Sequence, residues 1–303
     1  MILVAGGTGF VGGGIVRELA RRGKPVAVMS RSPQRAASRF PGLQVEYRQG
    51  DVRDPDSLAS AVQGAQVVIA SITLPNLPIE NRRRGYTFDA IDAAGTERLV
   101  TVAKAAGVGR FIYLSGAGAA PDARYHWHRA KWRAETAIRQ SEVPYVIFRP
   151  SWVYGPEDKA LNRFLRIARL SPVVPVIGDG NRQRLQPVFV DDVAWAVAEA
   201  VEGPAALNKV FEIGGPEVLT MNQIIATALA VMSKRRLVVN VPKGLVKLAA
   251  FFLQFLPGPP LTPNAVDFIT MDAVADNAAL AEALGFQPRP LRDRLAAYLA
   301  PHH

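Results

Sequence analysis

The chain has 303 residues, of which 49% are hydrophobic and 20% are charged, a composition that excludes a disordered or fibrous protein. It contains no cysteine, which excludes disulfides, a thiolate nucleophile and cysteine-based metal centres, and with only 4 histidines we expect no metal site. The formal net charge is +10, but the basic residues are dispersed except at residues 82–84 and 234–236. We therefore expect anionic small-molecule ligands and no nucleic-acid partner.

Short β-rich runs alternate with helical patterns in the first half of the chain. Strands are predicted at residues 2–5, 26–30, 45–48, 67–71, 111–115 and 145–149. Helices are predicted at residues 12–22, from Asp54 onward, at residues 87–106, and around Lys131 up to about Ser141. Because this alternation forms right-handed crossovers, the sequence predicts an α/β fold, a Rossmann doubly wound parallel sheet flanked by helices.

The pattern changes after Pro150, where prolines and glycines become dense and the elements alternate less regularly. We predict a dinucleotide-binding Rossmann domain at residues 1–155, to which strands and helices return from about residues 185–215. Residues 156–303 are predicted to form a smaller mixed α/β lobe, interleaved with the first domain and closing over it.

The lobe contains an apolar helix at residues 243–256. Its large side chains recur at helical spacing, and they include Leu245, Leu248, Phe251, Phe252, Phe255 and Leu256. We expect this helix to pack into its own lobe; the alternatives are a groove for an apolar, quinone-like molecule or a weak peripheral membrane contact. Lys247 and Gln254 interrupt the apolar run and Pro257 ends it, so we expect no transmembrane segment. Because no signal peptide is evident either, we expect a cytoplasmic protein.

A glycine-rich loop joins the first predicted strand to the first predicted helix, with the sequence Gly6-Gly7-Thr8-Gly9-Phe10-Val11-Gly12. Gly6 permits the tight turn, Gly9 lets the backbone approach a pyrophosphate, and Gly12 lets the helix pack closely on the sheet. The start of the helix adds unpaired N–H groups and the positive end of the helix dipole. We therefore predict that the loop binds a dinucleotide through Gly6, Thr8, Gly9, Phe10, Val11 and Gly12.

The residues after the second predicted strand select the dinucleotide. An Asp or Glu at this place would bind the ribose 2′-hydroxyl of NAD. This chain has Ser30-Arg31-Ser32 instead, with Arg35 one turn later. Because a guanidinium pairs with a 2′-phosphate, we predict NADP as the cofactor, bound by Arg31, Ser32 and Arg35. NAD is the alternative, in which Arg31 is only a solvated surface residue.

Several motifs together resemble the extended short-chain dehydrogenase/reductase superfamily. Besides the glycine loop, they are Gly50-Asp51-Val52, Phe111-Ile112-Tyr113-Leu114-Ser115, the residues 149–156, and Val190-Asp191-Asp192-Val193-Ala194. They cover most of the chain in the expected order. The sequence is similar to an atypical branch of this superfamily, the nucleotide-binding accessory subunit of respiratory complex I, and NmrA-like and isoflavone-reductase-like proteins are its neighbours.

The resemblance implies further contacts with the cofactor. Asp51 would accept a hydrogen bond from the adenine amino group and Val52 would flank the ring, although a carboxylate at this place could equally cap a turn. The remaining contacts would line the nicotinamide and its ribose, and they are Ser71, Ile72, Thr73, Ser115, Lys131, Pro150, Ser151 and Val153.

The resemblance also implies an active site, but one member of it is missing. The superfamily uses a Ser together with a Tyr four residues before a Lys, whose charge lowers the pKa of the Tyr hydroxyl. Ser115 and Lys131 occupy the Ser and Lys positions, whereas the Tyr position holds Trp127. An indole cannot transfer a proton in this range of pH, so the usual proton donor is absent from its usual place.

Other proton donors stand close to Trp127. Tyr125 would reach inward only if the helix begins after it, and His126 and His128 are the remaining candidates. Lys131 could also serve without chemistry, by donating to the hydroxyls of the nicotinamide ribose.

Two functions remain open on these grounds, beside a weaker third, a transcriptional co-regulator that senses the redox state of the dinucleotide, as NmrA-like proteins do. The first is a protein that binds NADP(H) without the tyrosine–lysine chemistry, in a structural, assembly or redox-sensing role. The second is an NADP-dependent reductase or epimerase-like oxidoreductase that acts on an apolar or quinone-like small molecule, with Lys131 and either Tyr125, a histidine or water in the proton transfer. The missing tyrosine favours the first. The sequence does not define a substrate or an oligomeric state.

Overall fold

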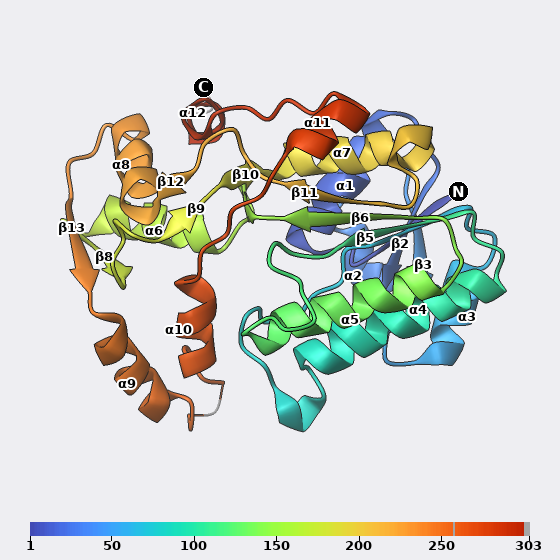
Figure 1. Ribbon diagram of the computed structural model, residues 1–303, viewed down its shortest axis with the longest axis horizontal. Helices are drawn as coiled ribbons and strands as arrows, with labels where there is room; N and C mark the ends of the chain where they lie inside the picture. The colour runs from blue at the N-terminus through green and yellow to red at the C-terminus, as the bar shows by residue number, and fades with distance from the viewer. Residues whose placement is uncertain (257, 300–303) are drawn as a thin grey trace.

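The computed structural model describes residues 1–256 and 258–299, and a sheet of seven strands lies at its centre (Figure 1). The strands of this sheet are β1 (Ile2–Ala5), β2 (Val26–Ser30), β3 (Glu46–Gln49), β4 (Val67–Ala70), β5 (Arg110–Leu114), β6 (Tyr145–Pro150) and β11 (Lys209–Ile213). Their order is β11-β6-β5-β4-β1-β2-β3, and every neighbouring pair is parallel. The predicted Rossmann sheet is confirmed.

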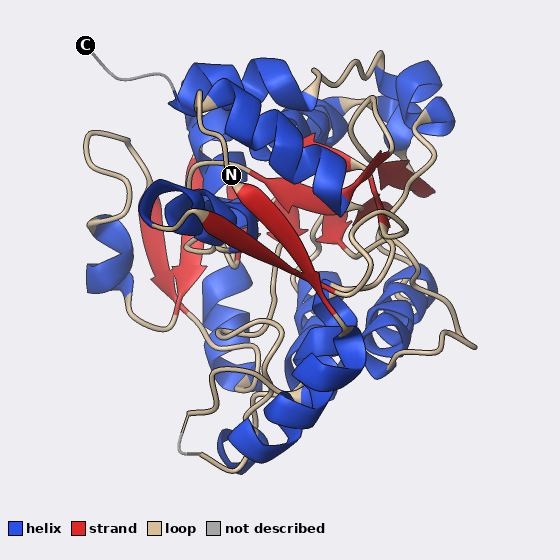
Figure 2. Cartoon of the chain, turned by 90° about the vertical axis from the view of Figure 1, so that its left-hand side faces the viewer, coloured by secondary structure: helices blue, strands red, loops and turns tan. Residues whose placement is uncertain are grey.

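Helices cover both faces of the sheet, as Figure 2 shows in blue against the red strands. One face carries α3 (Pro55–Val62), the π-helical turn η2 (Asp89–Ala93), α4 (Ala94–Ala105) and α5 (His126–Gln140). The other carries α1 (Phe10–Arg21), α7 (Val190–Glu202) and α11 (Ala278–Leu284), while the short α2 (Pro33–Ala37) follows β2. Because side chains alternate along a strand, Leu3 packs under the first group and Val4 under the second. Both faces are therefore buried, which is why β1 is apolar throughout.

The C-terminal lobe is built from short strand pairs and helices around its own core. Its pairs are β7 (Trp152–Tyr154) with β10 (Pro187–Phe189), β8 (Val173–Ile177) with β13 (Leu237–Val241), and β9 (Arg184–Leu185) with β12 (Leu219–Thr220). Its helices are α6 (Ala160–Leu170), α8 (Met221–Val231), α9 (Lys243–Leu253), α10 (Pro263–Ile269) and α12 (Leu291–Leu299). Elsewhere in the chain, single turns of 3-10 helix occur at η1 (Arg82–Arg84), between β4 and η2, and at η3 (Pro204–Ala206), between α7 and β11.

Local sequence fixes where the lobe helices begin. Thr220 and Gln223 form a reciprocal capping box at the start of α8. Thr262 accepts from the N–H of Ala265 at the start of α10, with Pro263 at the first helical position.

Several segments of the second half return to the Rossmann domain. Strand β11 extends the sheet beside β6, and α7 packs on α1. Helix α11 also leaves the lobe and packs against β11 and α7, and its Leu280 is fully buried there. Residues 278–284 fall within the range predicted for the interleaved lobe, and their apolar side chains complete the core on the α1 face. Residues 257 and 300–303 of the predicted lobe lie outside the described residues.

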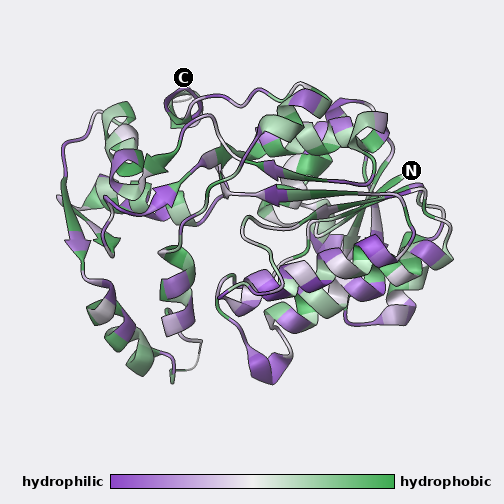
Figure 3. Ribbon diagram, in the orientation of Figure 1, coloured by the Kyte–Doolittle hydropathy of each residue, from purple (hydrophilic) through white to green (hydrophobic). Residues whose placement is uncertain are grey.

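The apolar helix of the lobe does not pack as expected. In α9 only Ala250 is buried, and most of the large apolar side chains are exposed. The ribbon of α9 is coloured largely as hydrophobic in Figure 3. The expectation that this helix packs into its own lobe was wrong, because its contact with α10 uses the other side of the helix. The helix ends at Leu253, and Pro257, which we expected to end it, is outside the described residues. None of the helices described here combines the length and the apolar character needed to cross a membrane.

Candidate functional site

The glycine loop lies between β1 and α1 and leaves the start of α1 open. Gly6 has a φ of 80°, and a Cβ atom on it would overlap the carbonyl of Ser71 at the end of β4. A Cβ on Gly12 would in turn overlap the carbonyl of Gly6. Gly9 is the N-cap, without any side chain to cap it, and the first turn contains no acidic residue.

The first N–H groups of α1 are therefore available to a ligand. Across the described part of the chain, no acceptor binds the N–H groups of Phe10, Val11 or Gly12, and the first helical bond runs from Gly13 to Gly9. Thr8 is half-buried beside them. Unpaired N–H groups in a first helical turn that has no acidic residue, next to a glycine-rich loop, fit the diphosphate of a dinucleotide.

Two guanidinium groups and a tyrosine gather beyond the end of β2. Arg31 donates from Nη1 to the hydroxyl of Tyr86 at 2.8 Å. The Tyr86 ring lies under both Arg31 and Arg53, whose guanidinium carbons are 5.6 and 4.7 Å from its centroid. Arg31 is thus exposed, and its contact with Tyr86 orients its guanidinium. Ser32 donates its N–H to Ser30 Oγ at 3.1 Å, while Arg35 is exposed on α2.

Asp51 is already engaged by its own turn. It accepts from the backbone N–H of Arg53 at 3.0 Å and from the Arg53 guanidinium at 2.6 Å. The Arg53 side chain holds the pKa of Asp51 below its ordinary value. The turn-capping alternative therefore describes its contacts in the structure. Val52 is buried in the core below, with its side chain against Gly95.

The carboxyl ends of β4, β5 and β6 meet beside the glycine loop. Ser71 donates its N–H to Ala5 of β1 at 2.9 Å, and Ile72 and Thr73 follow it. Pro150 ends β6, and Ser151 donates its N–H to Ile213 at 2.9 Å and its hydroxyl to the carbonyl of Gln186. Val153 is half-buried in β7. In parallel sheets of this order, ligands bind where neighbouring strands diverge, here between β1 and β4.

The hydroxyl of Ser115 is taken up by a buried carboxylate. Ser115, directly after β5, donates to Glu135 Oε1 at 2.6 Å, and Glu135 has no exposed surface. Arg149 binds both oxygens of that carboxylate, at 2.8 and 2.7 Å, and Arg139 adds a contact at 2.6 Å. Four charge-assisted contacts satisfy Glu135, and they orient the Ser115 proton into the protein.

Lys131 is paired with a second buried carboxylate. Its Nζ lies 2.8 Å from Asp92 Oδ1 in the π-helical turn η2, and it donates to the carbonyl of Leu114 at 3.3 Å. Burial acts to lower the pKa of Lys131, but Asp92 and Tyr113 outweigh it and raise that pKa above its ordinary value. Burial also raises the pKa of the Tyr113 hydroxyl, to about 12. A Lys131 locked in this ion pair is not a free proton donor, nor is it a solvated helix lysine.

Trp127 fills the tyrosine position with packed aromatic surface. It is 4% exposed, and its ring stacks on Tyr125 at 4.4 Å and meets the edge of Phe268 at 5.3 Å. Helix α5 begins at His126, so Tyr125 lies outside the helix in extended backbone. His126 is 3.4 Å from Glu80. Tyr125, which is six residues before Lys131, therefore lies just before α5 and stacks on the ring of Trp127.

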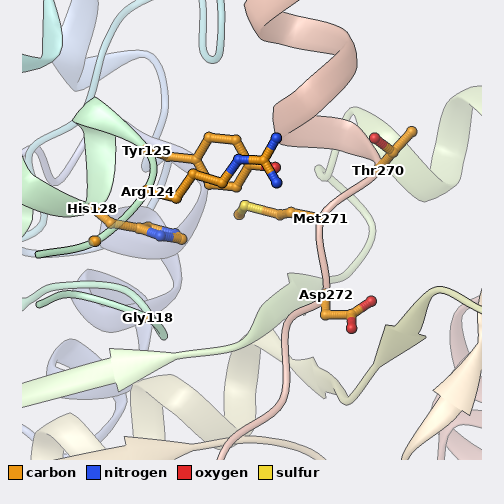
Figure 4. A pocket seen from close by; sticks show the side chains of 8 residues that line it. Gly118, Arg124, Tyr125, His128, Thr270, Met271 and Asp272 are labelled. Atoms are coloured by element: carbon orange, nitrogen blue, oxygen red, sulfur yellow. The ribbon is translucent and has the colours of Figure 1, made fainter. Parts of the chain in front are cut away.

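A cavity of about 450 Å³ opens beside this aromatic group. Figure 4 shows Arg124, Tyr125 and His128 on one wall and Met271 pointing toward them from the segment after α10. Gly118 has a φ of 84° and lies against the His128 ring. Burial lowers the pKa of His128, so its imidazole is neutral at neutral pH. Among the described residues, no group of three or more His, Asp or Glu side chains could hold a metal ion.

Comparison with known proteins decides the family. The model of a family described as NAD(P)H-binding matches residues 6–170, more than half of the chain and the part that contains the glycine loop. The chain belongs to this NAD(P)H-binding family. Among curated proteins, NADH dehydrogenase (ubiquinone) 1 alpha subcomplex subunit 9 of Arabidopsis thaliana is 30% identical over 305 residues, which cover 95% of this chain and 74% of that protein. The resemblance inferred from the sequence motifs is thus confirmed.

A further curated protein and two solved structures are also similar to this chain. A ceramide reductase of Caulobacter vibrioides is 30% identical over 195 residues, or 64% of this chain and 58% of that protein. The solved structure of gox2253 matches with a TM-score of 0.77 at 23% identity, over 99% of this chain and 97% of the other. An NADPH-dependent quinone oxidoreductase of Escherichia coli, complexed with NADPH, matches at 0.73 and 20% identity, over 99% and 100%. These two structures support the fold alone.

Three residues beside the candidate site were not predicted from the sequence. Asp92 holds Lys131, while Tyr86 and Arg53 support Arg31. For Asp92 a signal existed, because a lone carboxylate on the apolar face of a helix requires a buried cation. Tyr86 and Arg53 gave none, since their contact with the end of β2 depends on how two distant loops fold together.

Proposed function

We propose that this NAD(P)H-binding protein holds NADP(H) without the tyrosine–lysine chemistry, in a structural, assembly or redox-sensing role. One observation carries the proposal: Trp127 stands where the proton-donating phenol would be, and the lysine four residues later is held by Asp92. Both features favour binding over turnover.

The pairing of the polar groups supports this function. A bound nicotinamide would accept or donate hydride, and a reductase needs a proton donor beside the substrate. Ser115 gives its proton to Glu135, and Lys131 is committed to Asp92. The backbone of the glycine loop, by contrast, is open to the diphosphate. The residues retained at this site are thus suited to binding and orienting a dinucleotide.

The preference for NADP over NAD rests on the side chains beyond β2. Arg31 is fixed by Tyr86, and Arg53 lies over the same ring. No carboxylate takes part in the contacts of Arg31 within the described residues. A 2′-phosphate would therefore meet a guanidinium positioned by Tyr86, and the charge of the nearby Asp51 is balanced by its pair with Arg53.

Calorimetric titration with NADPH and with NADH, together with an assay of turnover, tests the proposal. We expect tighter binding of NADPH, and no NADPH oxidation above background against a panel of quinones, ketones and ceramide-like carbonyl compounds. Equal or reversed affinities would reject the NADP assignment. Sustained oxidation with any substrate class would reject the binding-only role while leaving the dinucleotide site in place.

The cavity beside Tyr125 favours a second candidate, an NADP-dependent reductase of an apolar carbonyl compound. Tyr125 and His128 line that cavity, where the Tyr125 hydroxyl could donate a proton and the neutral His128 could relay one. A reductase of this kind would lose turnover in His128→Gln or Tyr125→Phe while keeping its affinity for NADPH. Activity that is unchanged in both variants would leave this candidate without a proton donor.

A further inference from the structure

Helix α9 carries its apolar side outward. At about 100° per residue, Leu245, Leu248 and Phe252 project from one side of α9, and Leu256 follows shortly after the helix ends at Leu253. Phe251 and Phe255 widen that side. We call these six residues the α9 face.

The side of α9 that packs on α10 is the less apolar one. It carries Lys247 and the small Ala250, and the Lys247 ammonium lies 2.9 Å from Asp267 of α10. On the α9 face, Phe255 is 73% exposed, Phe252 65% and Leu245 62%. A helix that had evolved only to close its own lobe would place these side chains inward. The helix therefore presents an apolar surface to something outside the chain.

The charge around this surface has one sign. From Val218 to Val266 the sequence contains five basic residues and no acidic one. Lys243 and Lys247 are tied to Asp267, whereas Lys234 and Arg235 are exposed and form no ion pair within the described residues. The strand β13, between these two pairs, adds Leu237 at 64% exposure. In Figure 1, β13 and α9 follow one another down the same outer edge of the lobe.

We propose that the α9 face binds the surface of an anionic phospholipid bilayer. An amphipathic helix rich in Phe and Leu, with lysine and arginine beside it, lies in the plane of a membrane interface and favours anionic lipid. With 11 residues, α9 can lie in that plane but cannot span the bilayer. A second copy of this chain is a poorer occupant, because a symmetric contact would bring the same unpaired basic segments together. The proposal is independent of whether the bound dinucleotide reacts.

Vesicle sedimentation of the full chain tests this surface. The probes are vesicles of phosphatidylcholine alone and of phosphatidylcholine with about one-third phosphatidylglycerol. We expect binding to the anionic vesicles, weakened by salt. The double variant Phe252→Ser/Phe255→Ser should lower the partition coefficient about tenfold. The matched control, Val218→Ser/Val274→Ser, also replaces two exposed apolar residues and should bind like the wild type.

A second variant reports insertion directly. Phe252→Trp should show a blue shift of its emission when the anionic vesicles are added, because the ring enters the acyl boundary. The double variant Lys234→Ser/Arg235→Ser should lose part of the affinity and most of its salt dependence. Vesicle binding that Phe252→Ser/Phe255→Ser leaves unchanged would overturn the proposal. So would a concentration-dependent dimer that this variant abolishes, found together with no vesicle binding, because the face would then be a contact between copies.

Discussion

The two ends of the candidate dinucleotide site differ in how their polar groups are engaged. At the diphosphate end, α1 begins without a side-chain cap, and the Arg31 guanidinium donates to the neutral hydroxyl of Tyr86. At the nicotinamide end, Ser115 and Lys131 are each bound to a buried carboxylate. The first end has donors left over for a ligand and the second has almost none. The difference shows how a fold can retain groups that bind a dinucleotide while the groups for proton transfer form buried hydrogen bonds and ion pairs.

The largest effect is expected from breaking the pair at the nicotinamide end. Lys131→Ala would leave the fully buried Asp92 without its cation, so we expect a loss of about 3–5 kcal/mol in the free energy of unfolding, measured by urea denaturation. Lys104→Ala is the control, since it removes a lysine from an exposed pair with Glu142 and should cost at most about 1 kcal/mol. A stable Lys131→Ala protein with weakened NADPH binding would instead show that this lysine serves the cofactor.

A carboxylate in the lobe shows what burial does without a cationic partner. Asp158 is 6% exposed and, among the described residues, accepts from backbone N–H groups alone, at the start of α6; burial raises its pKa to about 6. The folded state then binds a proton more tightly than the unfolded chain, whose Asp pKa is about 3.8. Stability contributed by this group is present at low pH and is lost as the pH rises through that window, by about 3 kcal/mol in total.

Asp158→Asn should remove this dependence. We expect the difference in unfolding free energy between wild type and variant to change between about pH 4 and pH 6 and to be constant above it. Urea denaturation across this range measures the difference. If this free-energy difference does not vary with pH, Asp158 is charged throughout. Asp158 would then not differ from Glu135, the buried carboxylate that is paired with arginines.

At the diphosphate end we expect an effect on binding alone. Arg31→Asp would replace the guanidinium by a charge that repels the 2′-phosphate, so NADPH affinity should fall about tenfold to a hundredfold, roughly 1.4–2.7 kcal/mol. NADH affinity should stay the same or rise. Arg166→Asp, an exposed arginine on α6, is the charge-matched control for calorimetry. Parallel losses for both dinucleotides would mean that Arg31 does not read the phosphate.

The smallest effect is expected at Ser115. Ser115→Ala removes one of four contacts of the buried Glu135, which should cost about 1–2 kcal/mol of stability. NADPH affinity should not change, because the hydroxyl faces the protein interior. Urea denaturation and calorimetry on the same sample separate the two. Weakened NADPH binding with unaltered stability would instead show that the Ser115 hydroxyl contacts the cofactor.

The sheet and the glycine loop could be predicted because their signals are local. Buried strands read as apolar runs, and Gly6 and Gly12 are required by close backbone approaches that any chain of this topology must make. The pairing of Lys131 with Asp92 spans two helices that meet only in the folded protein. Nothing in the residues around Lys131 indicates which of several acids it will reach.

The outward face of α9 shows a different limit of sequence reasoning. Periodicity located the helix and its apolar side, but the same pattern describes a helix that is buried in its lobe and one that is turned outward. The orientation is set by the contact with α10, where Asp267 binds Lys243 and Lys247. Asp267 binds the lysine side of α9, so the opposite, apolar side remains exposed. The position of Asp267 beside α9 is known only from the folded lobe.

Calorimetric titration of the purified chain with NADPH, followed by the same titration with NADH, tests the central claim most directly. The account predicts saturable heat for one NADPH per chain and weaker binding of NADH. The absence of heat with either dinucleotide from folded protein would contradict it, because the open start of α1 and the positioned Arg31 would then have no ligand.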